Sequence, residues 1–152
     1  MNNEELKKKI LSILPIAELI ENPQFLSFNI PSDGFYKLAK SLKESDDLAF
    51  NFLFCLTGMD YGDSLGVVYH LSSTKYGHEI VLKVSAGNRE TPAIDTVCDI
   101  WRTAEFHERE VFDLFGIKFN NHPDLRRLFL EENWVGHPLR KDYIDEVNIV
   151  ER

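Results

Sequence analysis

Apolar residues recur with helical spacing in two stretches of the N-terminal region. The first stretch spans residues 3–14, and its apolar positions are Leu6, Ile10, Ile13 and Leu14. Pro15 follows and ends the helix, because proline cannot continue one. A second helix is expected after Pro31, where Ser32 or Asp33 could cap its first turn. The apolar residues on its face are Phe35, Leu38, Ala39 and Leu42.

Short apolar runs bounded by turn residues predict four strands. Residues 25–30 form one such run between Pro23 and Pro31. The other three runs span residues 50–57, 67–72 and 79–84, with turns at Gly62-Asp63 and Tyr76-Gly77. Because these turns are short, we expect the three runs to pair in antiparallel fashion.

The stretch from Thr91 to Gly116 predicts further helix. Thr91 offers a capping hydroxyl, and Pro92 suits the first helical position. The apolar face that follows consists of Ile94, Val97, Cys98 and Trp101. The apolar stripe is interrupted over residues 102–110 and resumes before Gly116, a glycine suited to a helix C-terminus. We therefore expect two helices that meet near Thr103.

Residues 117–152, called the C-terminal segment below, contain two prolines and show no sustained period. Their large apolar residues argue against a disordered tail: Phe119, Leu125, Leu128, Phe129, Leu130, Trp134, Leu139 and Tyr143. The predicted fold is α+β, a small antiparallel or mixed sheet with helices packed on it, plus an extended irregular C-terminal segment. Residues 1–116 would form the globular domain, and residues 117–152 a docking segment.

Composition narrows the class of protein. The chain has 152 residues, the size of one domain, and a net charge of −8, which argues against nucleic-acid binding. No apolar run approaches the roughly 18 residues of a transmembrane helix. The N-terminus is too charged for a signal peptide, so we expect a cytosolic chain that meets a membrane only through a partner. Cys55 and Cys98 are expected to be buried thiols.

Basic residues are divided unevenly along the chain. The first 88 residues contain eight lysines and no arginine, and all seven arginines lie at position 89 or later. Arginine pairs bidentately with carboxylates and is enriched at protein interfaces, where lysine is depleted. The distribution predicts a solvated first half and a contacting second half.

A metal site, a hydrolase and a nucleic-acid-binding surface are the alternatives to a surface that contacts another protein. His107, His122 and His137 recur every fifteen residues, but they lack a short-spaced pair, so no metal site is expected and histidines hydrogen-bonded in turns are favoured. A hydrolase could use Glu108, Glu110 and His107. Helix ion pairs, including Arg109 with Asp113, explain the acidic run more simply.

The basic pairs Arg126-Arg127 and Arg140-Lys141 are balanced by nearby acidic residues, which does not suit a phosphate backbone. Arginine, tryptophan and tyrosine among apolar residues are typical of the core of a protein interface. Pro123 and Pro138 stiffen the chain, which lowers the entropic cost of holding it on a partner. The residues favour a docking surface.

Residues 105–143, EFHEREVFDLFGIKFNNHPDLRRLFLEENWVGHPLRKDY, closely resemble the signature of the C-type subunit of NADH–quinone oxidoreductase, respiratory complex I. The resemblance covers about a quarter of the chain. The positions expected to contact a partner are Glu108, Arg109, Glu110, Asp113, His122, Pro123, Arg126, Arg127, Trp134, Gly136, His137, Pro138, Arg140, Lys141, Asp142 and Tyr143.

This resemblance implies a non-redox subunit of the peripheral arm, on the cytoplasmic side of the membrane. Its C-terminal segment would lie along the D-type subunit, which is the hydrogenase-like large subunit, beside other peripheral-arm subunits. It implies no cofactor in this chain, while FMN, iron–sulfur clusters and quinone would belong to the whole complex. Similar subunits occur in membrane-bound hydrogenases and in ferredoxin- or F420-linked complexes, which remain alternatives.

The chain departs from the family pattern at two positions, Leu130 and Ile144, where many members have proline. Some members are fused to the D-type subunit. Because this sequence stops at Arg152, we expect a separate subunit.

Overall fold

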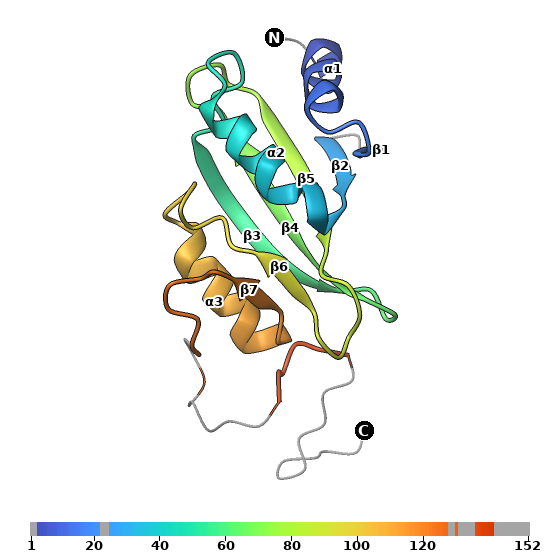
Figure 1. Ribbon diagram of the computed structural model, residues 1–152, viewed down its shortest axis with the longest axis vertical. Helices are drawn as coiled ribbons and strands as arrows, with labels where there is room; N and C mark the ends of the chain where they lie inside the picture. Colours follow the sequence, from blue (N-terminus) through green and yellow to red (C-terminus); the bar gives the residue numbers. More distant parts are fainter. Residues whose placement is uncertain (1–2, 22–24, 128–129, 131–135, 142–152) are drawn as a thin grey trace.

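The computed structural model describes residues 3–21, 25–127, 130 and 136–141. Its main sheet has five strands in the order β1-β2-β5-β4-β3, and β6 and β7 form a separate parallel pair. The strands of the main sheet are β1 (Glu18–Ile20), β2 (Leu26–Ile30), β3 (Phe52–Asp60), β4 (Leu65–Ser72) and β5 (Glu79–Ser85). The predicted α+β fold with a mixed sheet is confirmed (Figure 1).

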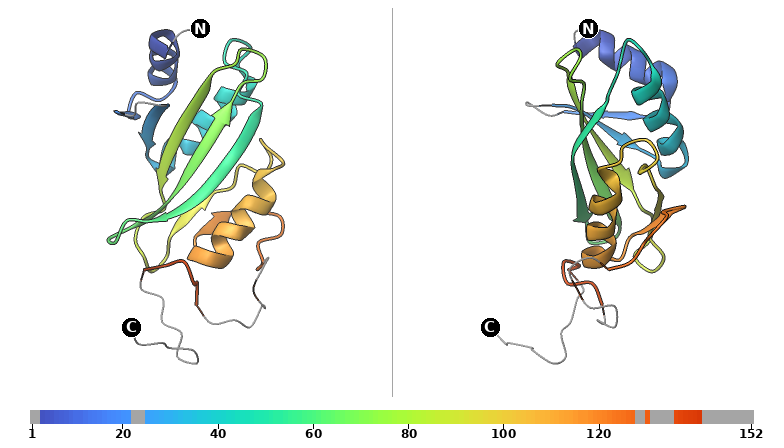
Figure 2. Two further views of the ribbon diagram at one scale, coloured as in Figure 1. Left: turned by 180° about the vertical axis from the view of Figure 1, so that it is seen from behind. Right: turned by 90° about the vertical axis from the view of Figure 1, so that its left-hand side faces the viewer.

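The predicted antiparallel strands form as expected. β3 pairs with β4 and β4 with β5, both antiparallel, whereas β2 pairs with β5 in parallel. The parallel pair is possible because helix α2 (Ser32–Glu44) lies in the connection that leaves β2. Seen from behind, β3, β4 and β5 lie in front of α2 (Figure 2).

The core lies between the sheet and the helices. The four predicted apolar residues of α2 are buried, and the Phe35 ring packs on Tyr69 of β4 with centroids 4.6 Å apart. Helix α1 (Asn3–Ile13) buries Leu6 and Ile10 beside α2 and ends before Pro15, as predicted. The predicted cap of α2 is wrong, because its N-cap is Pro31 and no side chain caps it.

The helix predicted to begin at Thr91 is absent from the structure. Strand β6 (Ala93–Asp95) and turns occupy that stretch instead. Asn88 accepts the backbone N–H of Thr91 at 2.8 Å and its hydroxyl at 3.2 Å, so Thr91 closes a loop rather than capping a helix. The second predicted helix is present as α3 (Ala104–Phe115), and it begins after Thr103 as expected.

The C-terminal segment begins inside the fold. Ile117 and Phe119 are buried, and β7 (Lys118–Asn120) pairs with β6. Sequence periodicity does not predict this strand, because three residues are too few to show alternation. Cys55 and Cys98 are each half-buried, so the prediction of buried thiols is wrong. None of the helices in the described residues has the length and apolar character needed to cross a bilayer.

Candidate functional site: the C-terminal segment on helix α3

Helix α3 buries charged as well as apolar residues. Ala104, Glu108 and Val111 are buried at helical spacing. Arg109 and Asp113, four residues apart, are also buried and lie on an adjoining face of the helix. Gly116 ends α3 in the left-handed conformation with φ 76°, which glycine adopts without strain. The polar residues of this face lie where the C-terminal segment passes the helix.

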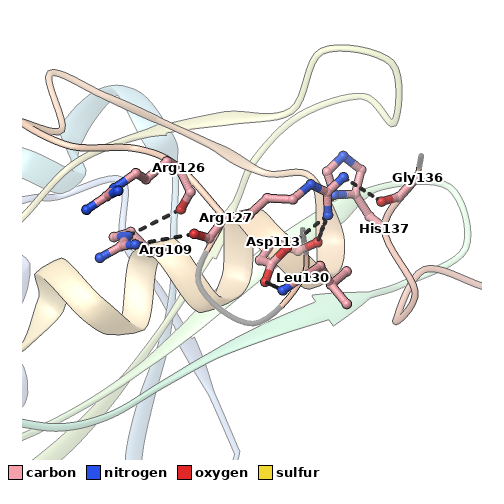
Figure 3. A network of polar contacts seen from close by, with 7 residues as sticks. All are labelled: Arg109, Asp113, Arg126, Arg127, Leu130, Gly136 and His137. Carbon is pink, nitrogen blue, oxygen red and sulfur yellow. Dashed lines mark hydrogen bonds and ion pairs between the residues drawn. The ribbon is translucent and has the colours of Figure 1, made fainter. Parts of the chain in front are cut away.

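Asp113 is the centre of a polar network that holds the C-terminal segment (Figure 3). The Arg127 guanidinium donates to its carboxylate at 2.9 Å and to its backbone carbonyl at 3.0 Å. The backbone N–H of Leu130 donates to the other carboxylate oxygen at 3.0 Å. The Asp113 side chain is 0% exposed and that of Arg127 10%, so this ion pair is largely removed from water.

Arg109 and Arg127 extend the network along the backbone. Arg109 donates to the carbonyls of Arg126 and Arg127, at 3.2 and 3.3 Å. Arg127 also donates to the carbonyl of Gly136 at 2.7 Å. The predicted helix ion pair between Arg109 and Asp113 is therefore replaced by contacts from each residue to the C-terminal segment.

His122 and His137, each followed by a proline, are hydrogen-bonded to α3, which confirms the prediction of hydrogen-bonded histidines for these two residues. His122 Nε2 lies 3.1 Å from the carbonyl of Glu105, and His137 Nδ1 lies 3.0 Å from that of Asp113. Burial lowers the pKa of His137. A Cβ at Gly116 would lie 2.6 Å from the His137 ring, so only glycine allows this approach.

A second contact fixes the C-terminal segment to the end of β3. Arg89 donates to both carboxylate oxygens of Asp60, and the Lys141 N–H donates to one of them at 2.7 Å. Arg140 donates to the Arg89 carbonyl at 2.6 Å. The Arg89 guanidinium holds the pKa of Asp60 well below its usual range. The sequence does not single out Asp60, because an aspartate just before a turn is common.

Glu108 is hydrogen-bonded to the loop between β6 and α3 rather than to the polar network around Asp113. Its carboxylate accepts from the Thr96 hydroxyl at 2.6 and 2.8 Å and from the Val97 N–H at 3.2 Å. Burial raises its pKa to about 8. Because Glu108 is 0% exposed, a substrate could not reach it in this arrangement, which argues against the hydrolase alternative.

The expected partner-contacting residues fall into four groups. Glu108, Arg109 and Asp113 are buried, whereas Pro123, Arg126 and Lys141 are exposed. The half-buried residues are Glu110, His122, Arg127, Gly136, His137, Pro138 and Arg140. Trp134, Asp142 and Tyr143 lie outside the described residues. The structure thus brings most of the described set together on and around α3, and contact with a partner stays a prediction.

Comparisons with known proteins agree on one family. Residues 28–147 match the family model for the 30 Kd subunit of respiratory-chain NADH dehydrogenase. The chain is 48% identical over 120 residues to the C/D-type subunit of NADH-quinone oxidoreductase from Phocaeicola vulgatus, covering 78% of this chain and 23% of that one. It is 40% identical over 131 residues to the C-type subunit from Chloroherpeton thalassium, covering 84% and 54%.

A solved structure is also similar. A chain in the membrane-bound sulfane sulfur reductase, an archaeal respiratory membrane complex, superposes with a TM-score of 0.74 at 28% identity. The match covers 95% of this chain and 86% of that one. The chain thus spans about a quarter of the Phocaeicola relative and about half of the Chloroherpeton relative, but most of the archaeal chain.

Proposed function

This chain belongs to the family of the 30 Kd subunit of respiratory-chain NADH dehydrogenase, and on that premise we propose that it is the C-type subunit of a NADH–quinone oxidoreductase. In this role it binds no redox cofactor. It joins the peripheral arm on the cytoplasmic side of the membrane and docks on the hydrogenase-like large subunit, the D-type subunit, with other peripheral-arm subunits nearby. It thereby supports electron transfer from NADH to quinone, coupled to proton translocation.

One observation carries the docking part of this proposal. Hydrogen bonds to α3 hold the backbone of the C-terminal segment, while some side chains of the same segment are exposed to solvent. The Arg126 side chain is 59% exposed although its carbonyl is held by Arg109, and Leu139 is 54% exposed although its N–H donates to Leu114. A prearranged backbone lowers the entropic cost of binding. An exposed arginine suits an interface, where arginine is enriched.

The fused relatives support the choice of partner. The Phocaeicola protein, by its name, joins the C and D types in one chain, of which the present chain matches 23%. Fusion keeps the two parts at high effective concentration, which suits parts that work in contact.

The similarity to the archaeal chain favours a second function, as a subunit of a related membrane complex. The membrane-bound sulfane sulfur reductase contains a chain of the same fold, so the same kind of subunit serves a complex named for a different substrate. The present chain could therefore belong to a related membrane complex with another electron donor or acceptor. Assays of the purified complex with NADH and quinone, and with a polysulfide, separate the two possibilities.

The docking proposal is tested by co-purification with the co-expressed large subunit of the same organism. Arg126→Ala should weaken the association by about 2–5 kcal/mol if the exposed arginine becomes a buried charge partner in the complex. Arg102→Ala, which removes another exposed arginine at the start of α3, is the matched control and should co-purify normally. Equal recovery of both variants would contradict docking through this surface. Arg140→Ala is less informative, because Arg140 also holds the Arg89 carbonyl.

A further inference from the structure

Three side chains of the kinds that bind metals converge beside α3. Cys98 lies between β6 and α3, Glu108 on α3, and His122 in the turn after β7. Each offers one ligand atom, and these atoms all lie within 4.8 Å of one another. No sequence pattern points to this group, because its members lie far apart along the chain and the regular spacing of the three histidines does not include the cysteine.

The donor set suits zinc. Thiolate, carboxylate and imidazole are the three ligand types of protein Zn²⁺ sites, with bonds of about 2.0–2.3 Å. In a tetrahedral site such bonds place ligand atoms roughly 3.3–3.8 Å apart. The three atoms would have to approach one another by only about 1 Å to reach that spacing, which side-chain rotation can supply.

Thr96 positions two of the three groups. Its hydroxyl donates to the Glu108 carboxylate at 2.6 Å and accepts the Cys98 N–H at 3.2 Å. The Val97 N–H also donates to Glu108. These contacts aim the buried carboxylate toward the start of the β6–α3 connection, as the outer partners of metal ligands do in known sites.

His122 must change partners to bind a metal. Its Nδ1 accepts the Asp124 N–H at 3.0 Å, so Nε2 carries the proton and faces the Glu105 carbonyl at 3.1 Å. Pro123 and Asp124 are exposed, so the turn that carries the imidazole can adjust without disturbing the core. Metal binding through Nδ1 therefore replaces the Asp124 contact and keeps the Glu105 contact, whereas binding through Nε2 replaces both.

A cavity beside Cys98 provides access. It encloses about 500 Å³ and is lined by Thr96 and Cys98 together with three acidic residues, Asp95, Asp99 and Glu105, and one basic residue, Arg102. The excess of acidic groups favours a cation over an anion. The cavity also leaves room for a water molecule as a further ligand.

We propose that Cys98, Glu108 and His122 form a Zn²⁺ site, with water from this cavity in the fourth position. Binding releases the thiol proton of Cys98 and a proton from Glu108 when that group is protonated. The metal ties the β6–α3 connection and α3 to the first His-Pro turn of the C-terminal segment. This site does not depend on the proposed place in a respiratory complex.

Competition with a chromophoric chelator tests the site on the purified full-length chain. One Zn²⁺ should bind per chain. Cys98→Ser should weaken binding by at least about tenfold, since loss of an outer-shell partner alone costs about 10- to 100-fold. Cys55→Ser removes the other half-buried cysteine and should change nothing. With Co²⁺ as the probe, the thiolate charge-transfer absorption should disappear in Cys98→Ser and persist in Cys55→Ser.

A second pair of variants keeps the test decisive if Cys98→Ser is unstable. His122→Ala should weaken Zn²⁺ binding, whereas His107→Ala, which removes a half-buried histidine on the same helix as Glu108, should not. The proposal is overturned if the chain does not bind Zn²⁺, if the cobalt complex lacks thiolate absorption, or if His122→Ala and His107→Ala bind equally well.

Discussion

The globular domain and the C-terminal segment are stabilised in different ways. The domain, which includes β7 with the buried Ile117 and Phe119, rests on a continuous apolar core in which α2 packs against the sheet. Beyond β7, the described part of the C-terminal segment is fixed mainly by hydrogen bonds to polar groups of α3 and to the end of β3. Apolar burial is spread over many residues, whereas the polar contacts converge on Asp113 and Asp60.

This difference determines how each region responds to substitution. Loss of one apolar side chain weakens the whole domain, because the core is cooperative. Loss of a group at the centre of the polar network should free the C-terminal segment while the domain stays folded. A docking surface of this kind can be disabled locally, and the following substitutions test that distinction.

Phe35→Ala should have the largest effect. Phe35 is fully buried against Tyr69, and truncation of such a phenylalanine costs about 3–5 kcal/mol. Thermal unfolding should show one transition at lower temperature, with the domain and the C-terminal segment lost together. A variant that released only the C-terminal segment would contradict a shared core.

Glu108→Gln, measured with a chelator present, tests the buried carboxyl that is hydrogen-bonded to Thr96. Burial raises the pKa of Glu108 from 4.5 to about 8 on folding. Between these values the native carboxyl keeps a proton that the unfolded chain has released, so stability should fall as pH rises, by up to about 1.4 kcal/mol per pH unit.

Glutamine cannot titrate, so Glu108→Gln should flatten this dependence in denaturant unfolding over roughly pH 5 to roughly pH 8, the window set by that shift. Glu110→Gln on the same helix is the matched control and should keep the slope. Equal slopes for wild type and Glu108→Gln would show that Glu108 is ionised in the native state.

Asp113→Asn should act locally. The substitution keeps the shape of the side chain but removes the charge that pairs with Arg127, at a cost of about 1–3 kcal/mol. Limited proteolysis should cut the C-terminal segment faster, while far-UV circular dichroism of the domain is preserved. Glu110→Gln again serves as the control, and equal cleavage of the two variants would argue against a central role for Asp113.

Arg126→Ala should have the smallest effect on stability. Its side chain is exposed and pairs only within its own turn, with Asp124 at 3.1 Å among the contacts described, so the free energy of unfolding should change by no more than about 0.5 kcal/mol. Equilibrium denaturation measures this directly. A large loss of stability would mean that weaker co-purification of this variant reflects misfolding rather than lost docking.

Much of the fold follows from the sequence because long periodic stretches dominate it. Helices α1 and α2 show apolar residues at helical spacing, and strands β2 to β5 are apolar runs bounded by turn residues. Strands β1, β6 and β7 have three residues each, too short for a period, and Ile94, Val97 and Trp101 imitate helical spacing across a strand and a turn. The placement of these short strands depends on residues that are distant in the sequence. For example, the Lys118 N–H donates to the Pro92 carbonyl.

Most residues of the candidate site can be predicted from the sequence, but Asp60 and the roles of the predicted residues cannot. The arginines and histidines stand out in the sequence, which favours their exposure to a partner. The structure shows that Arg109, Arg127 and His137 donate to backbone or carboxylate groups of the same chain. A sequence alone does not distinguish an arginine that binds a partner from one that holds a backbone in place, since both need the same planar group of donors.

Hydrogen exchange of the isolated chain, compared with the chain bound to the co-expressed large subunit, tests the central claim most directly. The Leu130 and Leu139 amides, which donate to Asp113 and Leu114, should already be protected in isolation. Binding should add protection at residues 123–127 and leave β4 and β5 unchanged. Unprotected Leu130 and Leu139 amides in the isolated chain, or no added protection on binding, would contradict a segment that is arranged by its own domain and bound by a partner.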